Sequence, residues 1–239
     1  MHRKLFDLAR ANAGKGSGIR SESDGDVANV YVYDIIDAYW GVSAQDFVRT
    51  ISNIDCGQVN LHINSPGGDV FEARAMMAAV AEHEASFTAK IDGLCASAAT
   101  ALSLACANVE IVEGGFYMIH KAWTLALGNA DDMRTTSELL DKIDGVLADG
   151  YAKKSGMDRD AVIAAMAAET WYTADEAVEA GFADALIEIG GTKNSANGFD
   201  VNAYANAPKS LIEQPTEPDW NAAIARRSAR ARLYERSAA

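Results

Sequence analysis

The stretch SFTAKIDGLCASAATALSLACA, residues 86–107, contains the strand-to-helix junction from which the fold prediction starts. Residues 86–91 alternate apolar and polar side chains, which is the two-residue period of a strand. Gly93 interrupts the pattern, and residues 98–107 are almost entirely apolar, which predicts a buried helix. Ser97 lies at the junction, where the free amides of a helix N-terminus favour negative charge.

Strand and helix patterns continue on both sides of this stretch. Residues 30–33 read as a strand, followed by a helix through Phe47 that has Ser43 as its N-cap. Residues 59–64 read as a strand followed by a helix over 69–83. Two more strands are predicted at 109–112 and 116–119. Successive strand–helix units predict an α/β fold with parallel strands and right-handed crossovers.

The chain after residue 120 is predicted to be mainly helical. A long helix is expected over about 130–154, with one apolar stripe formed by Met133, Leu140, Ile143, Leu147 and Tyr151. Shorter helices are predicted at 160–167 and 174–180, the second closed by Gly181. A last strand follows at 183–189.

Composition divides the chain into three parts. Residues 1–26 are polar and contain several glycines, which predicts a flexible lead-in, and residues 27–189 form the α/β domain. Residues 190–239 hold three of the four prolines and are expected to form a tail. Its end, residues 221–239, has five arginines and one glutamate, a net charge of 5 − 1 = +4 and a basic amphipathic character.

The whole-chain composition excludes several classes of protein. A chain of 239 residues with 49% hydrophobic residues has an ordinary globular composition, and its net charge of −13 argues against nucleic-acid binding. The three cysteines include no CxxC pair, so we expect free thiols in a reducing compartment. The sequence shows neither a secretory signal nor a membrane-spanning stretch, and a cytoplasmic protein is expected.

Ser97 and His120 are the candidate nucleophile and base. His120 ends the predicted strand 116–119, and the ends of parallel strands face a ligand crevice. A neutral imidazole with a pKa near ~6.5 accepts a proton from a serine hydroxyl. The alternatives are that Ser97 only caps the helix that follows it, and that His120 is a surface residue.

The loop NSPGGD, residues 64–69, links a strand to a helix and contains Gly67 and Gly68. Glycines let the backbone approach a bound chain closely, so the loop is a candidate oxyanion hole or an edge on which a substrate pairs as a strand. A triad also needs an acid near the imidazole, and Glu169 is the candidate. The alternative is that Glu169 is an exposed carboxylate at a helix end.

Four motifs in this order resemble the ClpP family, the proteolytic subunits of caseinolytic proteases. They are INSPGG at 63–68, GLCASA at 93–98, MIH at 118–120 and TADEAVEAGFAD at 173–184. The resemblance covers about residues 27–189. It implies a crotonase-like fold with a long protruding helix, and a serine endopeptidase that needs no cofactor and no metal.

The resemblance also implies a role for each matching position. Ser97 and His120 take the places of the nucleophile and base, and Glu169 takes that of the acid, for which the family usually has Asp. Asp158 and Asp175 are the alternatives for the acid. The oxyanion hole is implied at the amides of Gly68 and Ala98, and substrate binding at Gly67 and Gly68.

The motif ETW at 169–171 and the extended tail resemble the ClpP-related head maturation proteases of tailed phages. The ClpP resemblance implies a homo-oligomeric ring and a polypeptide substrate, and the phage resemblance adds capsid, portal or scaffold proteins as partners. Composition predicts no membrane and no nucleic acid as partners. Three alternatives stay open: an acyl-CoA hydratase or isomerase on the same scaffold, a Ser-Lys hydrolase using Lys121 or Lys90, and a ring-forming assembly factor without activity.

Overall fold

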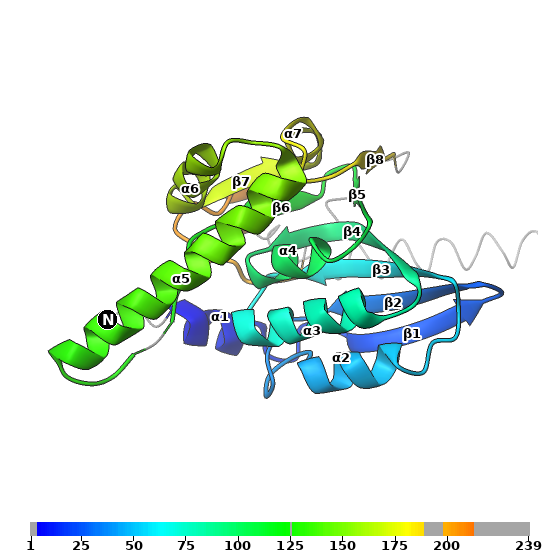
Figure 1. Ribbon diagram of the computed structural model, residues 1–239, viewed down its shortest axis with the longest axis horizontal. Coiled ribbons are helices and arrows are strands. Elements are labelled where there is room, and N and C mark those ends of the chain that lie inside the picture. Colours follow the sequence, from blue (N-terminus) through cyan, green and yellow to red (C-terminus); the bar gives the residue numbers. More distant parts are fainter. Residues whose placement is uncertain (1–3, 125, 189–197, 213–239) are drawn as a thin grey trace, which may run out of the picture.

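The computed structural model describes residues 4–124, 126–188 and 198–212, whose strands form one eight-stranded sheet (Figure 1). The strands are β1 Gly18–Asp24, β2 Val27–Tyr33, β3 Gln58–Ser65, β4 Ser86–Ala96, β5 Asn108–Val112, β6 Phe116–Ile119, β7 Thr170–Thr173 and β8 Ala185–Ile187. The helices are α1 Lys4–Asn12, α2 Ala44–Ile51, α3 Val70–Glu82, α4 Ala98–Ser103, α5 Ala130–Ser155, α6 Arg159–Ala167, α7 Ala174–Glu179 and α8 Lys209–Ile212.

The sheet has the strand order β1-β2-β3-β4-β5-β8, and β2 through β8 in this series are parallel, which confirms the α/β prediction. Strand β4 has different neighbours along its length. Its residues 88–91 pair with β5, whereas its residues 94–96 pair with β6, which in turn pairs antiparallel with β7. The sheet therefore divides just before Ser97, and β6 rather than β5 lies beside the end of β4.

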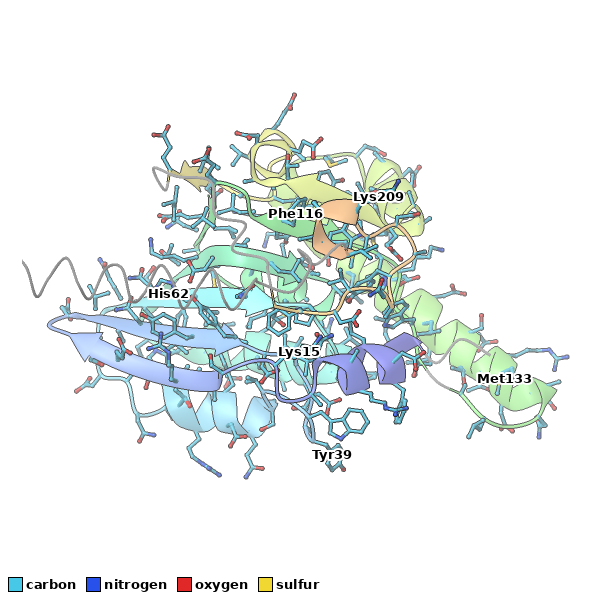
Figure 2. All side chains as sticks on the ribbon, turned by 180° about the vertical axis from the view of Figure 1, so that it is seen from behind. Lys15, Tyr39, His62, Phe116, Met133 and Lys209 are labelled. Atoms are coloured by element: carbon cyan, nitrogen blue, oxygen red, sulfur yellow. The ribbon has the colours of Figure 1, made fainter. Side chains whose placement is uncertain are left out.

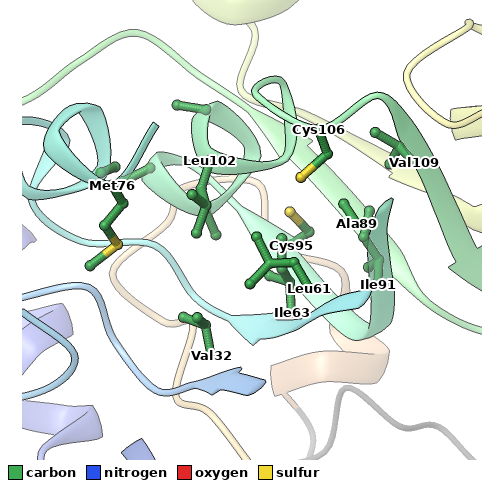
Figure 3. Close-up of a cluster of buried hydrophobic side chains, with 14 of the residues drawn as sticks. Val32, Leu61, Ile63, Met76, Ala89, Ile91, Cys95, Leu102, Cys106 and Val109 are labelled. Carbon is green, nitrogen blue, oxygen red and sulfur yellow. The ribbon is translucent and has the colours of Figure 1, made fainter. Parts of the chain in front are cut away.

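One face of the sheet is covered by α2, α3 and α4, and the side chains between them form what we call the first cluster (Figures 1 and 3). Leu61 and Ile63 of β3 alternate with half-buried polar residues and face Met76 of α3. Cys95 and Cys106 lie in the same cluster as free thiols. Burial raises the pKa of both thiols, that of Cys106 to about 12, so they behave as apolar side chains.

Most predicted helices are confirmed, with different ends. Ser43 caps α2 by accepting a hydrogen bond from the Asp46 amide. Helix α4 ends at Ser103, shorter than predicted, because the chain turns there and the Ala107 amide donates to the Phe87 carbonyl. None of the helices among the described residues is both long and apolar enough to cross a membrane.

Helix α5 has 26 residues, about 39 Å at 1.5 Å per residue, and projects beyond the sheet (Figure 1). The predicted apolar stripe is only partly buried. Ile143, Leu147 and Tyr151 pack on the domain, whereas Met133 lies exposed near the outer end of the helix (Figure 2).

The predictions for the two chain ends require correction. Residues 4–24, expected to be a flexible lead-in, form α1 and β1, and β1 pairs antiparallel with β2 along its whole length. Strand β1 is an edge strand with exposed side chains, so its sequence is polar despite its regular structure. Residues 198–212 of the expected tail fold against the domain, and the basic stretch 221–239 lies outside the described residues.

Helix α1 and residues 198–212 form a second cluster on the opposite face of the sheet, at the end of β4 (Figure 2). Asn12 of α1 and Asp200 are joined by reciprocal hydrogen bonds of 2.8 and 2.6 Å. The buried members of the second cluster are Leu8, Ala9, Ile35, Leu94, Ala96, Met118, Phe199, Val201, Tyr204, Ala207 and Leu211. The two clusters thus pack against opposite faces of the strand that leads to Ser97.

Candidate active site

Ser97 occupies the sharp turn between β4 and α4 and has φ 55° and ψ −122°. A positive φ is costly for a residue other than glycine, and such strain persists only where the surrounding structure enforces it. The Ser97 side chain makes no capping hydrogen bond to α4. Its Oγ instead lies 2.6 Å from Nε2 of His120. The structure therefore rejects the alternative that Ser97 is only a helix cap.

His120 follows the last residue of β6, and the pairing of β6 with β4 brings it to Ser97. Ala96 is the partner of Met118 in this register, and the Ser97 amide donates to the Met118 carbonyl at 2.9 Å. The imidazole is 7% exposed. It meets the rings of Trp123 and Tyr204 edge-on, with centroids 4.7 and 5.4 Å away. His120 is thus a buried residue held between aromatic rings, and the surface alternative is wrong.

Gly67 lies directly against the Ser97 turn. A Cβ at Gly67 would be 2.5 Å from the Ala96 carbonyl oxygen and 2.8 Å from the Ser97 Cβ. Real Cβ atoms do not approach so closely, so only glycine fits at this contact. The two predicted motifs, around residues 67 and 97, therefore touch through their backbones.

The residues predicted to form the oxyanion hole are Gly68 and Ala98. Ile36 forms a parallel bridge to the Gly68 loop, in which the Ile36 amide donates to the Gly67 carbonyl and the Ile36 carbonyl accepts from the Asp69 amide. The Gly68 amide therefore points away from Ile36. Ala98 begins α4, so its amide has no acceptor within the helix. Both residues line the same groove as Ser97 and His120, and the oxyanion hole predicted at their amides stays a prediction.

The groove beside Ser97 is mainly apolar. Leu140, Ile143 and Leu147 of α5 form one wall, and Val70 and Phe71 at the start of α3 line it as well. The long helix thus lines the groove beside Ser97 with residues of its apolar stripe. A groove of this kind accepts an apolar side chain of a bound ligand.

Glu169 lies between α6 and β7, and its carboxylate contacts the C-terminal segment, residues 198–212. Its φ is 51°, and its carboxylate accepts hydrogen bonds from the amides of Ala205 at 3.0 Å and Asn206 at 2.6 Å. Of the two alternatives, Asp158 caps α6 by accepting from the Asp160 amide, and Asp175 is exposed on α7. The identity of the triad acid therefore stays a prediction.

The lysines proposed as alternative bases lie elsewhere. Lys90 lies in the first half of β4 and forms an ion pair of 2.6 Å with Glu110, and Lys121 is exposed.

Sequence reasoning also missed Tyr204, whose hydroxyl donates to the Pro66 carbonyl at 2.6 Å. Tyr204 is in no recognisable motif and lies 138 residues from Pro66, so nothing in the sequence pointed to it.

Fold and site together define a class: an α/β protein in which a serine hydroxyl at a strand-to-helix turn contacts a buried histidine. Comparisons with known proteins give the family. The family model described as Clp protease matches residues 44–190. This chain therefore belongs to the Clp protease family, whose members are serine peptidases.

Individual relatives agree with this assignment. The chain is 28% identical over 155 residues to an ATP-dependent Clp protease proteolytic subunit of Bacteroides fragilis, covering 64% of this chain and 75% of that one. It is 29% identical to proteolytic subunit 1 of Protochlamydia amoebophila, covering 68% and 81%. Among solved structures, a ClpP1 variant from Listeria monocytogenes matches with a TM-score of 0.60 at 17% identity, covering 71% and 94%. That last likeness shows the predicted fold.

Proposed function

We propose that the protein is a serine endopeptidase in which Ser97 is the nucleophile and His120 the general base. The observation that carries this proposal is the 2.6 Å contact between Ser97 Oγ and His120 Nε2 at a strained turn beside two amides. An N-cap serine or a buried structural histidine has no need of this geometry. Membership of a peptidase family supports the same reaction.

The reaction follows from these positions. Ser97 Oγ attacks the scissile carbonyl while its proton passes to Nε2 of His120, and the oxyanion accepts hydrogen bonds from the amides of Gly68 and Ala98. One such donor lowers the barrier by about 3 kcal/mol. The intermediate collapses as His120 gives the proton to the leaving amine. Water, activated by the same imidazole, then hydrolyses the acyl-enzyme.

The substrate is proposed to bind as an extended polypeptide. Gly67 and Gly68 present backbone groups along the edge of the site, where a peptide pairs as an added strand. The apolar wall formed by α5 would then receive a side chain next to the scissile bond. Glu169 remains the predicted acid of the triad.

The proposed chemistry is tested by treating the full-length protein with a fluorophosphonate and locating the adduct by mass spectrometry. We expect one adduct on Ser97, together with turnover of a denatured polypeptide, and neither in Ser97→Ala or His120→Ala. Activity that survives Ser97→Ala contradicts the proposal and favours hydratase or isomerase chemistry. Labelling of Ser97 without cleavage of the polypeptide favours the alternative of a ring-forming assembly factor without activity.

We further propose a homo-oligomeric ring that processes phage capsid or scaffold proteins during head maturation. The relatives are described as proteolytic subunits, and α5 carries exposed apolar residues, Leu139 and Val146, that suit contact with another copy. The native mass tests the ring. Incubation with candidate capsid, portal and scaffold proteins tests the role, and specific cleavage that requires Ser97 is the expected result.

A further inference from the structure

The C-terminal segment, residues 198–212, is built into the domain beside the proposed site. Its side chains Phe199, Val201 and Leu211 are buried in the second cluster, and its Asp200 pairs with Asn12. Figure 2 shows this segment, marked by Lys209, on the side of the sheet opposite α2 and α3. A segment fixed by so many buried contacts is part of the folded core.

Tyr204 is the residue of this segment that reaches the site. Its ring stacks on Trp123 with centroids 5.0 Å apart and an interplanar angle of 9°, and it meets His120 edge-on at 75°. Its hydroxyl donates to the carbonyl of Pro66, the residue before Gly67. Burial raises the pKa of the Tyr204 phenol, partly offset by the neighbouring Ser97 hydroxyl. Tyr204 therefore connects the imidazole to the glycine loop.

Glu169 fixes the position of Tyr204. Its two carboxylate oxygens accept from the amides of Ala205 and Asn206, the residues that follow Tyr204. The Asn206 side chain also donates to the Ala168 carbonyl at 2.8 Å. Hydrogen bonds to a carboxylate are among the stronger ones in proteins. They hold the backbone at Tyr204 and therefore its ring against His120.

The site is assembled while Tyr204 is in place. Ser97 and His120 are in contact, and the groove toward α5 is lined by other residues and not by Tyr204. A segment that blocked the site would instead be expected to separate the pair or fill the groove. The geometry therefore favours support of the site over obstruction.

We infer that Tyr204 is a positioning residue for His120, and that Glu169 acts on His120 through Tyr204. This inference rests on the proposed function. The aromatic ring restrains the imidazole so that Nε2 stays on the Ser97 hydroxyl, and the bond to Pro66 keeps the glycine loop in register with it. A small displacement of a catalytic group costs up to about a hundredfold in rate.

The test measures the rate of fluorophosphonate labelling of full-length protein from pH 5 to 10. In this step the Ser97 oxygen bonds to phosphorus, fluoride leaves and the hydroxyl proton passes to His120. Tyr204→Leu is expected to lower the plateau rate about tenfold to a hundredfold. The midpoint of the profile should rise, because an imidazole open to water is more easily protonated. Tyr204→Phe keeps the ring, so its midpoint should match the unmodified protein.

Leu211→Ala is the matched control, because Leu211 is buried in the same cluster but lies seven residues further along the chain. It should lower the melting temperature and leave the pH midpoint unchanged. If Tyr204→Leu does not fold, Tyr204→Met replaces it, since methionine fills irregular space. An unchanged or faster rate in the folded variant overturns the positioning role, and a faster rate means that the segment obstructs the site.

A double-mutant cycle tests the route from Glu169. Glu169→Gln is expected to slow labelling in the unmodified protein and to have little further effect in the Tyr204→Leu background. If Glu169→Gln lowers the labelling rate equally in the unmodified protein and in Tyr204→Leu, Glu169 does not act through Tyr204 and is the direct acid. If the unmodified protein shows no labelling that requires Ser97, the proposed function itself fails. That outcome differs from labelling that requires Ser97 but proceeds at the same rate after substitution of Tyr204, which overturns only the positioning role.

Discussion

The two faces of the sheet near Ser97 are stabilised by contacts of different kinds. The first cluster packs β3 and β4 together with α3 and α4, the helices that follow these strands in the chain. The second cluster joins α1 to the C-terminal segment, as in the Asn12–Asp200 pair, 188 residues apart. The first face packs against the β4–α4 turn that holds Ser97, and Tyr204 of the second face contacts the His120 ring. Packing of the first kind leaves a pattern in the local sequence, whereas contacts between distant parts of the chain do not.

The largest expected effect comes from crowding the contact on which the first face depends. A Cβ at Gly68, which has φ 145°, would lie 2.1 Å from the Ile36 carbonyl oxygen. Gly68→Ala should therefore displace the loop and its amide, and fluorophosphonate labelling should slow about 10²–10³-fold, the loss of an oxyanion donor. Gly14→Ala is the control, because Gly14 also has a positive φ but no atom within 4 Å. Equal labelling rates in the two variants would contradict the oxyanion assignment.

Local patterns predicted the first face well. The alternation in β3, the apolar run after Ser97 and the Ser43 cap all report interactions within a few residues of the chain. Ser97 and His120 were also predicted correctly as neighbours, because the ends of β4 and β6 meet at one edge of the sheet. Prediction worked where the fold brings together the ends of regular elements.

The second face could not be predicted because its contacts have no local signature. Strand β1 lies at the edge of the sheet with residues 20–23 exposed, and it was mistaken for a flexible lead-in. Tyr204 lies in an irregular stretch, and neither its partner Pro66 nor Glu169 is near it in the chain. Glu169 was predicted as the triad acid and stays a prediction, and its carboxylate contacts a segment whose position only the structure reveals.

The next effect, on stability, tests whether the two faces fold as one unit. Leu61 is fully buried in the first cluster, and Leu61→Ala should lower the free energy of unfolding by about 2–5 kcal/mol. Leu8 is the matched leucine in the second cluster, and Leu8→Ala should cost a similar amount if the faces unfold together. Urea titrations followed by circular dichroism measure both. A second, earlier transition in Leu8→Ala would show that the chain ends unfold separately.

A smaller effect isolates the link between the chain ends. Asn12 is fully buried, and Asn12→Ala would leave the Asp200 backbone groups without their partners, at a cost of about 1–3 kcal/mol. Hydrogen exchange should rise in residues 198–207 and stay unchanged in α3. Uniform loss of protection through the whole domain would contradict a local link. Asn202→Ala is the control, because Asn202 is exposed in the same turn.

The smallest effect concerns a contact that is entirely local. Glu176 accepts hydrogen bonds from the Thr173 amide and hydroxyl, and these lower its pKa from the usual 4.5. The folded state therefore binds this proton less tightly than the unfolded state. The resulting stability is present above about pH 4.5 and is lost as the pH falls through the lowered pKa.

Glu176→Gln should thus be less stable than the unmodified protein at pH 7, by under about 1 kcal/mol because solvent screens an exposed side chain. The difference should shrink at pH 3, because the carboxyl is then protonated in the unfolded state and the folded state loses the charge as the pH falls through its lowered pKa. Urea titrations at the two pH values measure it, with Glu179→Gln on the same helix as control. A loss at pH 3 as large as at pH 7 would mean that Glu176 acts through packing and not through its charge. The Thr173–Glu176 contact spans three residues, so the change in hydrogen exchange in Glu176→Gln should stay within α7. The Asn12–Asp200 contact spans 188 residues, so the change in Asn12→Ala should reach both α1 and residues 198–207.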